Sequence, residues 1–300
     1  MLETYIYRVV QGCSIRYDLY RPKITVPAPI IVWIHGGALI GGGRSWTHPV
    51  VREMLTEKGY AQVSIDYRLA PETKLPEIIE DVREAFRSIC EALPKQCNLD
   101  STRVGVIGGS AGGYLTLMTG FAVVPRPKAL VSLYGYGDIV GPWYSEPDPF
   151  YCRMPRVSEE EARGVVGGDP ISETHRGGPD RFRFYLWCRQ TGNWPKEIMG
   201  VDPRSDDAAF TPYCPERNVT RDYPPTLLLH GNADTDVPYE RSVDMARKLK
   251  DAGVEHDFIT VDGGPHGFDG RIKQKDWPGE KDSPIGRALL RIVDWFAGRV

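Results

Sequence analysis

Six short, mostly apolar runs constrain the fold of this chain more than any other feature. They are rich in Val, Ile and Leu, and they lie at residues 30–37, 61–67, 103–109, 129–135, 225–231 and 256–263. A strand with one solvent-exposed face alternates apolar and polar residues, whereas a strand buried on both faces is apolar almost throughout. The runs therefore predict buried strands of a parallel sheet.

Helical patterns separate these runs, with apolar residues at helical spacing. They lie at residues 49–59, 77–93, 111–123, 239–253 and 283–300. Alternating strands and helices predict an α/β fold with helices on both faces of a mostly parallel sheet. Residues 4–10 and 13–20 instead alternate apolar and polar around Gly12. They predict an antiparallel hairpin at the N-terminus.

Residues 138–222 break this alternation and are rich in Pro, Gly and aromatic residues. Ser158 and Glu161 have the spacing of a capping box that opens a short helix. A long insertion inside a compact domain is usually a functional lid or an elaborated loop. Since 300 residues fit one large α/β fold, we expect a single domain over residues 1–300 with a cap inserted at about 138–222.

Composition excludes several classes of function. The net charge is −3 and the basic residues are dispersed, so a nucleic-acid surface is not expected. No apolar run approaches the ~20 residues of a membrane span, and the N-terminus lacks a signal-peptide pattern. We expect a cytoplasmic monomer or weak homodimer. The six cysteines form no C-x-x-C pair and are interpreted as reduced thiols, with a bond among Cys152, Cys188 and Cys214 left open.

The stretch GGSAGG joins the run at 103–109 to the helical pattern at 111–123. It contains G-x-S-x-G between a buried strand and a helix, the context in which this motif forms a nucleophile elbow. A phosphate loop would need a Lys here, and a dinucleotide fold would need G-x-G-x-x-G. The motif therefore predicts that Ser110 is a nucleophile at a tight strand-to-helix turn.

A serine nucleophile needs a base and an acid that orients the base. His266 lies in GGPHGF, just after the last predicted strand. This position fits the chain order nucleophile, acid, histidine. The acid is expected after a strand between the two, where HGNADTDVP offers Asp234 and Asp236. Asp234 comes first after the strand and is the predicted acid, with Asp236 as the alternative.

The first buried run ends in His35-Gly36-Gly37-Ala38. Glycines in such a loop let backbone amides approach a substrate, as in the oxyanion loops of esterases. The predicted oxyanion donors are the amides of Gly37, Ala38 and Ala111.

These motifs together resemble the α/β-hydrolase fold carboxylesterases of the hormone-sensitive-lipase-like group. HGGA stands where that group has HGGG, DYRLAPE at 66–72 matches its characteristic stretch, and GGSAGG, HGNADTDVP and PHGF match its elbow, acid loop and histidine loop. The group usually has an acid where Gly109 stands, and it builds its cap mainly from the N-terminus. These departures shift the likeness toward small esterases related to the prolyl-oligopeptidase catalytic domain, feruloyl esterases and acetylxylan esterases.

The resemblance implies a carboxylesterase that hydrolyses short acyl esters through an acyl-enzyme, with a small-molecule ester as its partner and with no cofactor and no metal. The alternatives are an acetylxylan- or feruloyl-type esterase, a small amidase or peptidase with the same triad, and a non-catalytic binding protein on the same fold. We expect the cap to wall the substrate pocket with aromatic side chains. The predicted pocket residues are Trp143, Tyr144, Trp187, Tyr114 and Leu39.

Overall fold

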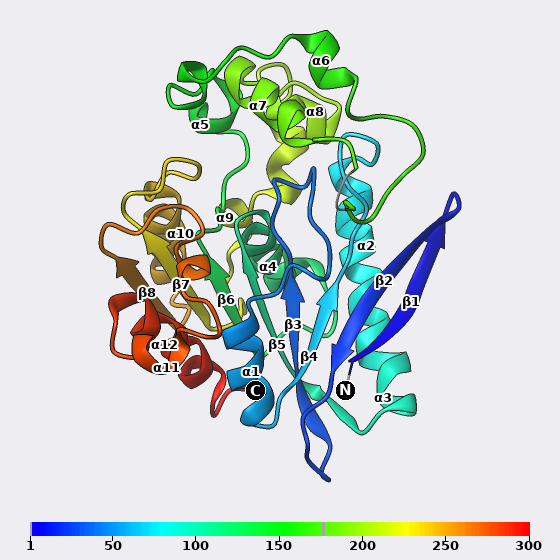
Figure 1. Ribbon diagram of the computed structural model, residues 1–300, viewed down its shortest axis with the longest axis vertical. Coiled ribbons are helices and arrows are strands. Elements are labelled where there is room, and N and C mark those ends of the chain that lie inside the picture. Colours follow the sequence, from blue (N-terminus) through cyan, green and yellow to red (C-terminus); the bar gives the residue numbers. More distant parts are fainter. Residues whose placement is uncertain (1, 176–177) are drawn as a thin grey trace.

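A single eight-stranded sheet forms the centre of the computed structural model, which describes residues 2–175 and 178–300 (Figure 1). The strands are β1 (Leu2–Val10), β2 (Cys13–Tyr20), β3 (Ala28–Ile34), β4 (Ala61–Ile65), β5 (Leu99–Gly109), β6 (Ala129–Leu133), β7 (Thr226–Gly231) and β8 (His256–Val261). Their order is β1-β2-β4-β3-β5-β6-β7-β8. The β1–β2 and β2–β4 pairs are antiparallel, and the six strands β3 to β8 run parallel to one another. The predicted parallel sheet with an antiparallel N-terminal hairpin is confirmed.

Helices cover both faces of the sheet, as expected. The longer helices are α1 (Pro49–Glu57), α2 (Leu75–Arg87), α4 (Ala111–Ala122), α7 (Phe182–Thr191), α10 (Glu240–Asp251) and α12 (Pro284–Phe296). Successive side chains of a strand point to opposite faces. In β3, Ile30 and Val32 pack in one core with α2, α4 and α10, whereas Ile31 packs in the other core with α1 and α12. Every residue of β3 is buried, which explains its unbroken apolar run.

The remaining helices are short. They are α3 (Leu93–Gln96), α5 (Pro142–Ser145), α6 (Glu159–Arg163), α8 (Trp194–Met199), α9 (Pro215–Asn218), α11 (Trp277–Glu280), the π-helix η1 (Ser88–Ala92) and the 3-10 helices η2 (Tyr151–Arg153), η3 (Ala208–Tyr213) and η4 (Phe268–Arg271). The helix expected at 77–93 is thus divided, since α2 gives way to η1 ahead of Pro94. The capping box of Ser158 and Glu161 opens α6, as predicted.

The segment between β6 and β7 holds α5 to α9 and no strand among its described residues. We call residues 138–222 the cap segment. Figure 1 shows α5 to α8 beyond the edge of the sheet to which the parallel strands point. Buried aromatic residues of the cap, including Tyr144, Phe184 and Trp194, belong to the same apolar core as β3, β4 and α4. The part of the cap segment that holds α5 to α8 therefore lies over the edge where open α/β sheets bind ligands.

Candidate active site

Ser110 lies in the turn between β5 and α4 and has a strained backbone with a positive φ of 57° and a ψ of −124°. Such angles are uncommon for a residue with a side chain, and they are often found at functional sites. The turn is tight because α4 begins directly against β3: a Cβ at Gly112 would overlap the carbonyl oxygen of Ile34. The glycine after Ala111 therefore lets the helix start next to the sheet and holds Ser110 above its edge.

The structure brings Ser110, His266 and Asp234 together from three separate loops. His266 Nε2 lies 3.0 Å from Ser110 Oγ, and His266 Nδ1 lies 2.7 Å from Asp234 Oδ2. The three loops follow β5, β8 and β7, whose carboxyl ends meet at one edge of the parallel sheet. In the neutral imidazole, Nδ1–H donates to Asp234 and Nε2 accepts from the Ser110 hydroxyl.

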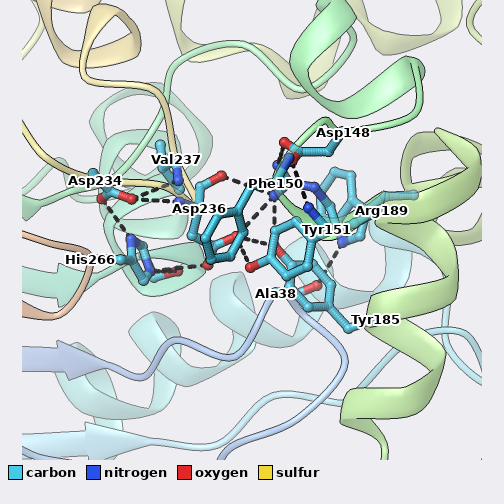
Figure 2. Close-up of polar contacts among 12 residues, drawn as sticks. Ala38, Asp148, Phe150, Tyr151, Tyr185, Arg189, Asp234, Asp236, Val237 and His266 are labelled. Carbon is cyan, nitrogen blue, oxygen red and sulfur yellow. Dashed lines mark hydrogen bonds and ion pairs between the residues drawn. The ribbon is translucent and has the colours of Figure 1, made fainter. Parts of the chain in front are cut away.

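Asp234 is held as a charged, fully buried acceptor (Figure 2). Its Oδ1 accepts from the backbone amides of Asp236 at 2.8 Å and Val237 at 2.9 Å. Its Oδ2 also accepts from His230 Nε2 at 3.1 Å. Burial raises the pKa of this carboxyl, but the hydrogen bonds from His230 and His266 outweigh burial and hold the pKa of Asp234 well below its ordinary value.

A second carboxylate lies beside the histidine. Asp236 Oδ2 is 3.4 Å from His266 Nε2, the nitrogen that faces Ser110. Burial lowers the pKa of His266, but Asp236 and Asp234 outweigh burial and raise the pKa above the ordinary value of 6.5. The sequence offers Asp236 only as an alternative acid for the same nitrogen as Asp234, whereas the structure places it at the opposite nitrogen.

The loop after β3 runs alongside Ser110. Gly37, Ala38 and Leu39 have left-handed φ values of 107°, 54° and 62°. Gly37 and Ala38 line the same cavity as Ser110. Ala111, the first residue of α4, is fully buried, and an amide at this position has no carbonyl partner within its helix. All three predicted oxyanion donors thus lie on the segments that flank Ser110.

Three groups of the cap segment contact this loop, residues 36–43, which we call the oxyanion loop after the role that the sequence predicts for it. Trp194 Nε1–H donates to the carbonyl oxygen of Ala38 at 3.0 Å. Arg181 Nε–H donates to the carbonyl oxygen of Ile40 at 2.6 Å, and the Thr174 amide donates to that of Gly42 at 2.8 Å. No sequence motif signals these contacts, because each joins residues more than 130 positions apart.

A cavity of about 860 Å³ opens beside Ser110 and His266. Its walls come from the oxyanion loop, from Trp33 and the 46–49 segment, from residues 267–274, and from the cap residues Tyr151, Arg181, Phe182 and Tyr185. Trp46 and Phe182 are each about half exposed, at 55% and 51%. The cavity therefore has aromatic side chains at its walls, and the carboxylate of Asp236 lines it together with Ser110.

None of the five predicted pocket residues lines this cavity in the part of the chain that the structure describes. Tyr144 stacks between Trp143 and Trp194, with ring centroids 3.7 and 4.0 Å apart. Trp187 is buried against Phe184. The largest aromatic side chains of the cap thus fill its own core. Leu39 and Tyr114 are also fully buried, and Tyr114 stacks on Tyr136 at 5.1 Å.

Other features of the chain can be placed alongside the site. All six cysteines are free thiols, including Cys152, Cys188 and Cys214. Among the described residues, no helix has the length and apolar character needed to cross a bilayer. The same residues contain no group of three or more His, Cys, Asp or Glu side chains arranged to hold a metal ion.

Two family models match separate parts of the chain. The BD-FAE model matches residues 17–126, which include the oxyanion loop and Ser110. The prolyl oligopeptidase family model matches residues 182–281, which include Asp234 and His266. The chain has the α/β-hydrolase fold and is similar to esterases. The expected likeness to esterases and to the prolyl-oligopeptidase catalytic domain is confirmed.

Curated relatives of this α/β-hydrolase include much longer proteins. It is 27% identical over 311 residues to the non-reducing polyketide synthase Preu6 of Preussia isomera, an alignment that covers 92% of this chain and 14% of that protein. It is 28% identical over 257 residues to esterase LipC of Mycobacterium tuberculosis, covering 84% of this chain and 56% of LipC. The chain thus spans about a seventh of the first relative and about half of the second.

Solved structures share its fold. A Staphylococcus aureus protein of unknown function is 25% identical with a TM-score of 0.79, and the match covers 99% of both chains. An acetyl ester-xyloside bifunctional hydrolase from Caldicellulosiruptor lactoaceticus is 20% identical with a TM-score of 0.67, covering 98% of this chain and 95% of the other.

Proposed function

We propose that this α/β-hydrolase is a carboxylesterase that hydrolyses short-chain acyl esters through Ser110, His266 and Asp234. The observation that carries the proposal is the continuous hydrogen-bonded series from Ser110 Oγ to His266 Nε2 and from His266 Nδ1 to Asp234. A nucleophile, a base and a buried orienting acid in this order form the template of serine hydrolases.

In the first half of the reaction, Ser110 Oγ attacks the ester carbonyl while His266 Nε2 takes the hydroxyl proton. The resulting imidazolium is stabilised by Asp234 at Nδ1. It then gives its proton to the oxygen of the leaving alcohol as the carbon–oxygen bond breaks, which leaves an acyl-serine. In the second half, His266 takes a proton from water while the water oxygen attacks the acyl-serine. The imidazolium then returns this proton to Ser110 Oγ as the bond between the acyl carbon and Oγ breaks, which releases the carboxylic acid and restores the resting enzyme.

The tetrahedral oxyanion is proposed to lie between the oxyanion loop and the start of α4. Its donors are the amides of Gly37, Ala38 and Ala111. Backbone donors that are already fixed cost no reorganisation when charge develops on the oxygen. The cap contacts to Ala38 and Ile40 support this role because they hold the loop in a left-handed conformation that two non-glycine residues adopt.

Preference for short acyl chains is supported by the cap, whose Tyr151, Phe182 and Tyr185 bound the cavity. The names of the relatives extend the range of substrates to test. An acetylated xyloside is included because a structural neighbour is an acetyl ester-xyloside hydrolase, and a polyketide acyl ester because the Preussia protein is a polyketide synthase. Feruloyl esters and amides test the remaining alternatives.

The decisive experiment compares the wild type with Ser110→Ala on p-nitrophenyl esters from acetyl to palmitoyl. Ser110→Ala is expected to abolish turnover with an unchanged melting temperature, and an organophosphate is expected to add its mass to the wild type at Ser110 alone. Asp234→Asn is expected to lower kcat by roughly 10⁴-fold, as for other triad acids. Near-native kcat in Ser110→Ala, or a label on another residue, would show that the proposal is wrong.

We further propose that the protein acts in the cytoplasm as a monomer or weak homodimer. Size-exclusion chromatography with light scattering over a range of concentrations tests the oligomeric state. A stable assembly larger than a dimer would contradict the proposed monomer or weak homodimer.

A further inference from the structure

Asp236 occupies an unusual place beside the catalytic base. Its two carboxylate oxygens have different surroundings (Figure 2). Oδ1 accepts hydrogen bonds from the Tyr151 hydroxyl at 2.9 Å, the Tyr185 hydroxyl and Arg189 Nη1 at 2.9 Å. Oδ2 lies 3.4 Å from His266 Nε2 and has no hydrogen-bond donor among the described residues. One oxygen is thus saturated by the cap segment, and the other faces the catalytic imidazole.

The cap segment fixes this orientation. Arg189 is buried and also donates to the backbone carbonyl of Asp236 at 2.9 Å, while its other terminal nitrogen pairs with Asp148. The guanidinium lies 4.9 Å from the ring centroid of Tyr144 and 4.7 Å from that of Tyr151. A buried arginine with two carboxylate partners and flanking rings is held rigidly. The carboxylate that it holds keeps its direction toward His266.

This placement has opposite effects on the two protonation states of His266. In the neutral histidine, Nε2 presents a lone pair to Ser110, and a carboxylate 3.4 Å away is unfavourable. In the imidazolium, Nε2 carries a proton and a share of positive charge, and the same carboxylate is favourable. An interaction that is stronger in the charged state than in the resting state lowers the barrier to reaching the charged state.

We propose that Asp236 is a second catalytic carboxylate, which stabilises the protonated form of His266 from the Nε2 side and which the cap segment holds in place through Tyr151, Tyr185 and Arg189. The proposal rests on the proposed esterase function. Asp236 exchanges no proton: the proton passes from Ser110 Oγ to His266 Nε2 and then to the leaving oxygen. Asp234 orients the ring, and Asp236 adds charge on the side where the proton arrives.

Other groups also face His266. Asp234 lies at Nδ1, and the Tyr134 ring packs edge-on with its centroid 4.8 Å away. Asp269, on η4, accepts from the Tyr134 hydroxyl at 2.7 Å and contributes a further negative charge. Arg189 is the cation of the cap that pairs with Asp236, and it also pairs with Asp148. Among these groups, Asp236 is the carboxylate that lies within 4 Å of Nε2.

The test is Asp236→Asn, which keeps the shape and an oxygen acceptor for the cap donors but removes the charge. We expect kcat to fall about tenfold with little change in KM, because one lost pKa unit of stabilisation of the imidazolium corresponds to a factor of ten. The acid limb of kcat/KM is expected to move about one unit toward lower pH. Asp251→Asn, at an exposed position at the end of α10, is the matched control and is expected to retain the wild-type profile.

A readout independent of activity separates this proposal from the proposed function. In the Ser110→Ala background, the His266 ring is titrated by NMR with and without Asp236→Asn. A lower pKa of His266 in the double variant supports the proposal, and an unchanged pKa overturns it. Failure of the esterase proposal would instead appear as retained activity in Ser110→Ala alone.

Asp236→Asn leaves Arg189 with one carboxylate partner, so a melting curve accompanies each measurement. If Asp236→Asn does not fold, the double variant Asp236→Asn/Arg189→Gln, which removes both charges of the ion pair, is used in its place. The pKa of His266 is expected to be lower in this double variant than in Arg189→Gln alone, and an equal pKa in these two folded variants overturns the proposal.

Discussion

At the scale of single residues, Gly36 is a point of close approach between the oxyanion loop and Ser110. A Cβ at this position would lie 2.8 Å from the carbonyl oxygen of Gly109 and 3.2 Å from Ser110 Cβ. Gly36→Ala is therefore expected to push the loop away from Ser110 and to lower kcat by about 100-fold, the loss typical of a misplacement near 1 Å. Steady-state kinetics with p-nitrophenyl acetate measure the loss.

Gly279→Ala is the matched control, because a Cβ there meets nothing within 4 Å and the residue lies in the short helix α11. It is expected to keep wild-type kcat. Equal activity of Gly36→Ala and wild type would show that the loop does not depend on this close approach.

The pH dependence follows from the charges around His266. As the proposed base, His266 works only when neutral, and neighbouring carboxylates raise its pKa above 6.5. Activity is therefore lost as the pH falls through this raised pKa. The pH at which kcat/KM is half-maximal is expected to lie above 6.5. A pH-rate profile with a detection method that does not depend on pH measures it. A midpoint below 6.5 would contradict the electrostatics described for the site.

The residues that the sequence could place, and those that it could not, differ in one respect. Ser110 and Asp234 follow the buried ends of β5 and β7, and His266 follows the partly exposed edge strand β8. Parallel strands deliver their carboxyl ends to one edge of the sheet, so the convergence of the three side chains follows from chain order. Trp187 and Tyr114 are aromatic residues of segments expected near the site. Composition alone does not show whether such a side chain lines a cavity or packs in a core. The side-chain direction that decides this depends on packing between distant segments.

At the scale of elements, α8 of the cap contacts the oxyanion loop through a hydrogen bond from Trp194 Nε1–H to the carbonyl oxygen of Ala38. Trp194→Phe keeps an aromatic ring but leaves this buried carbonyl without its donor, at a cost of about 1 kcal/mol. If the bond orders the oxyanion loop, kcat falls about fivefold while KM is unchanged, since the loop acts on the charged intermediate.

A boronic acid that forms a tetrahedral adduct with serine gives a second measurement for Trp194→Phe. Its affinity is expected to weaken in parallel with kcat, whereas a product carboxylic acid is expected to bind as in the wild type. Trp277→Phe, on α11 outside the cap, is the control. A change in stability alone, with wild-type kcat, would assign Trp194 a packing role.

The elements themselves could be predicted where periodicity was long and regular. The sheet strands and α1, α2, α4, α10 and α12 arise from such patterns, because burial on both faces, or on one helical stripe, leaves a visible period. The cap helices α5 to α9 are short, and α5, α8 and α9 each begin at or next to a proline. Only the capping box of α6 gave a local signal, since its two hydrogen bonds depend on neighbouring residues alone.

At the scale of the whole molecule, the substrate range is expected to depend on cap and body residues that meet at the cavity. Phe182 and Trp46 are large, half-exposed side chains that line the cavity. Phe182 belongs to the cap segment, and Trp46 belongs to the 46–49 segment of the body. Phe182→Ala and Trp46→Ala are expected to raise kcat/KM for octanoyl esters relative to butyryl esters, because each opens the cavity.

Trp143→Ala serves as the contrast, because Trp143 stacks in the cap core and does not line the cavity. It is expected to lower the melting temperature and to leave the octanoyl-to-butyryl ratio unchanged. A shifted ratio in Trp143→Ala with none in Phe182→Ala would place the acyl wall elsewhere.

The junctions of the cap segment have a consequence for how such enzymes diversify. The segment leaves the body after β6, and the chain comes back to this point at α9, where the Glu216 amide donates to the carbonyl oxygen of Gly137 at 3.0 Å. A foreign cap joined to the body at these two adjacent residues is expected to leave the sheet undisturbed. Yet Trp194 and Arg181 belong to the exchanged piece, while the carbonyls they bind, on Ala38 and Ile40, stay with the body. A graft that lacks these two donors is expected to fold and bind new esters but turn them over slowly. A cap that changes the substrate specificity must therefore also carry the two donors if the turnover rate is to be kept.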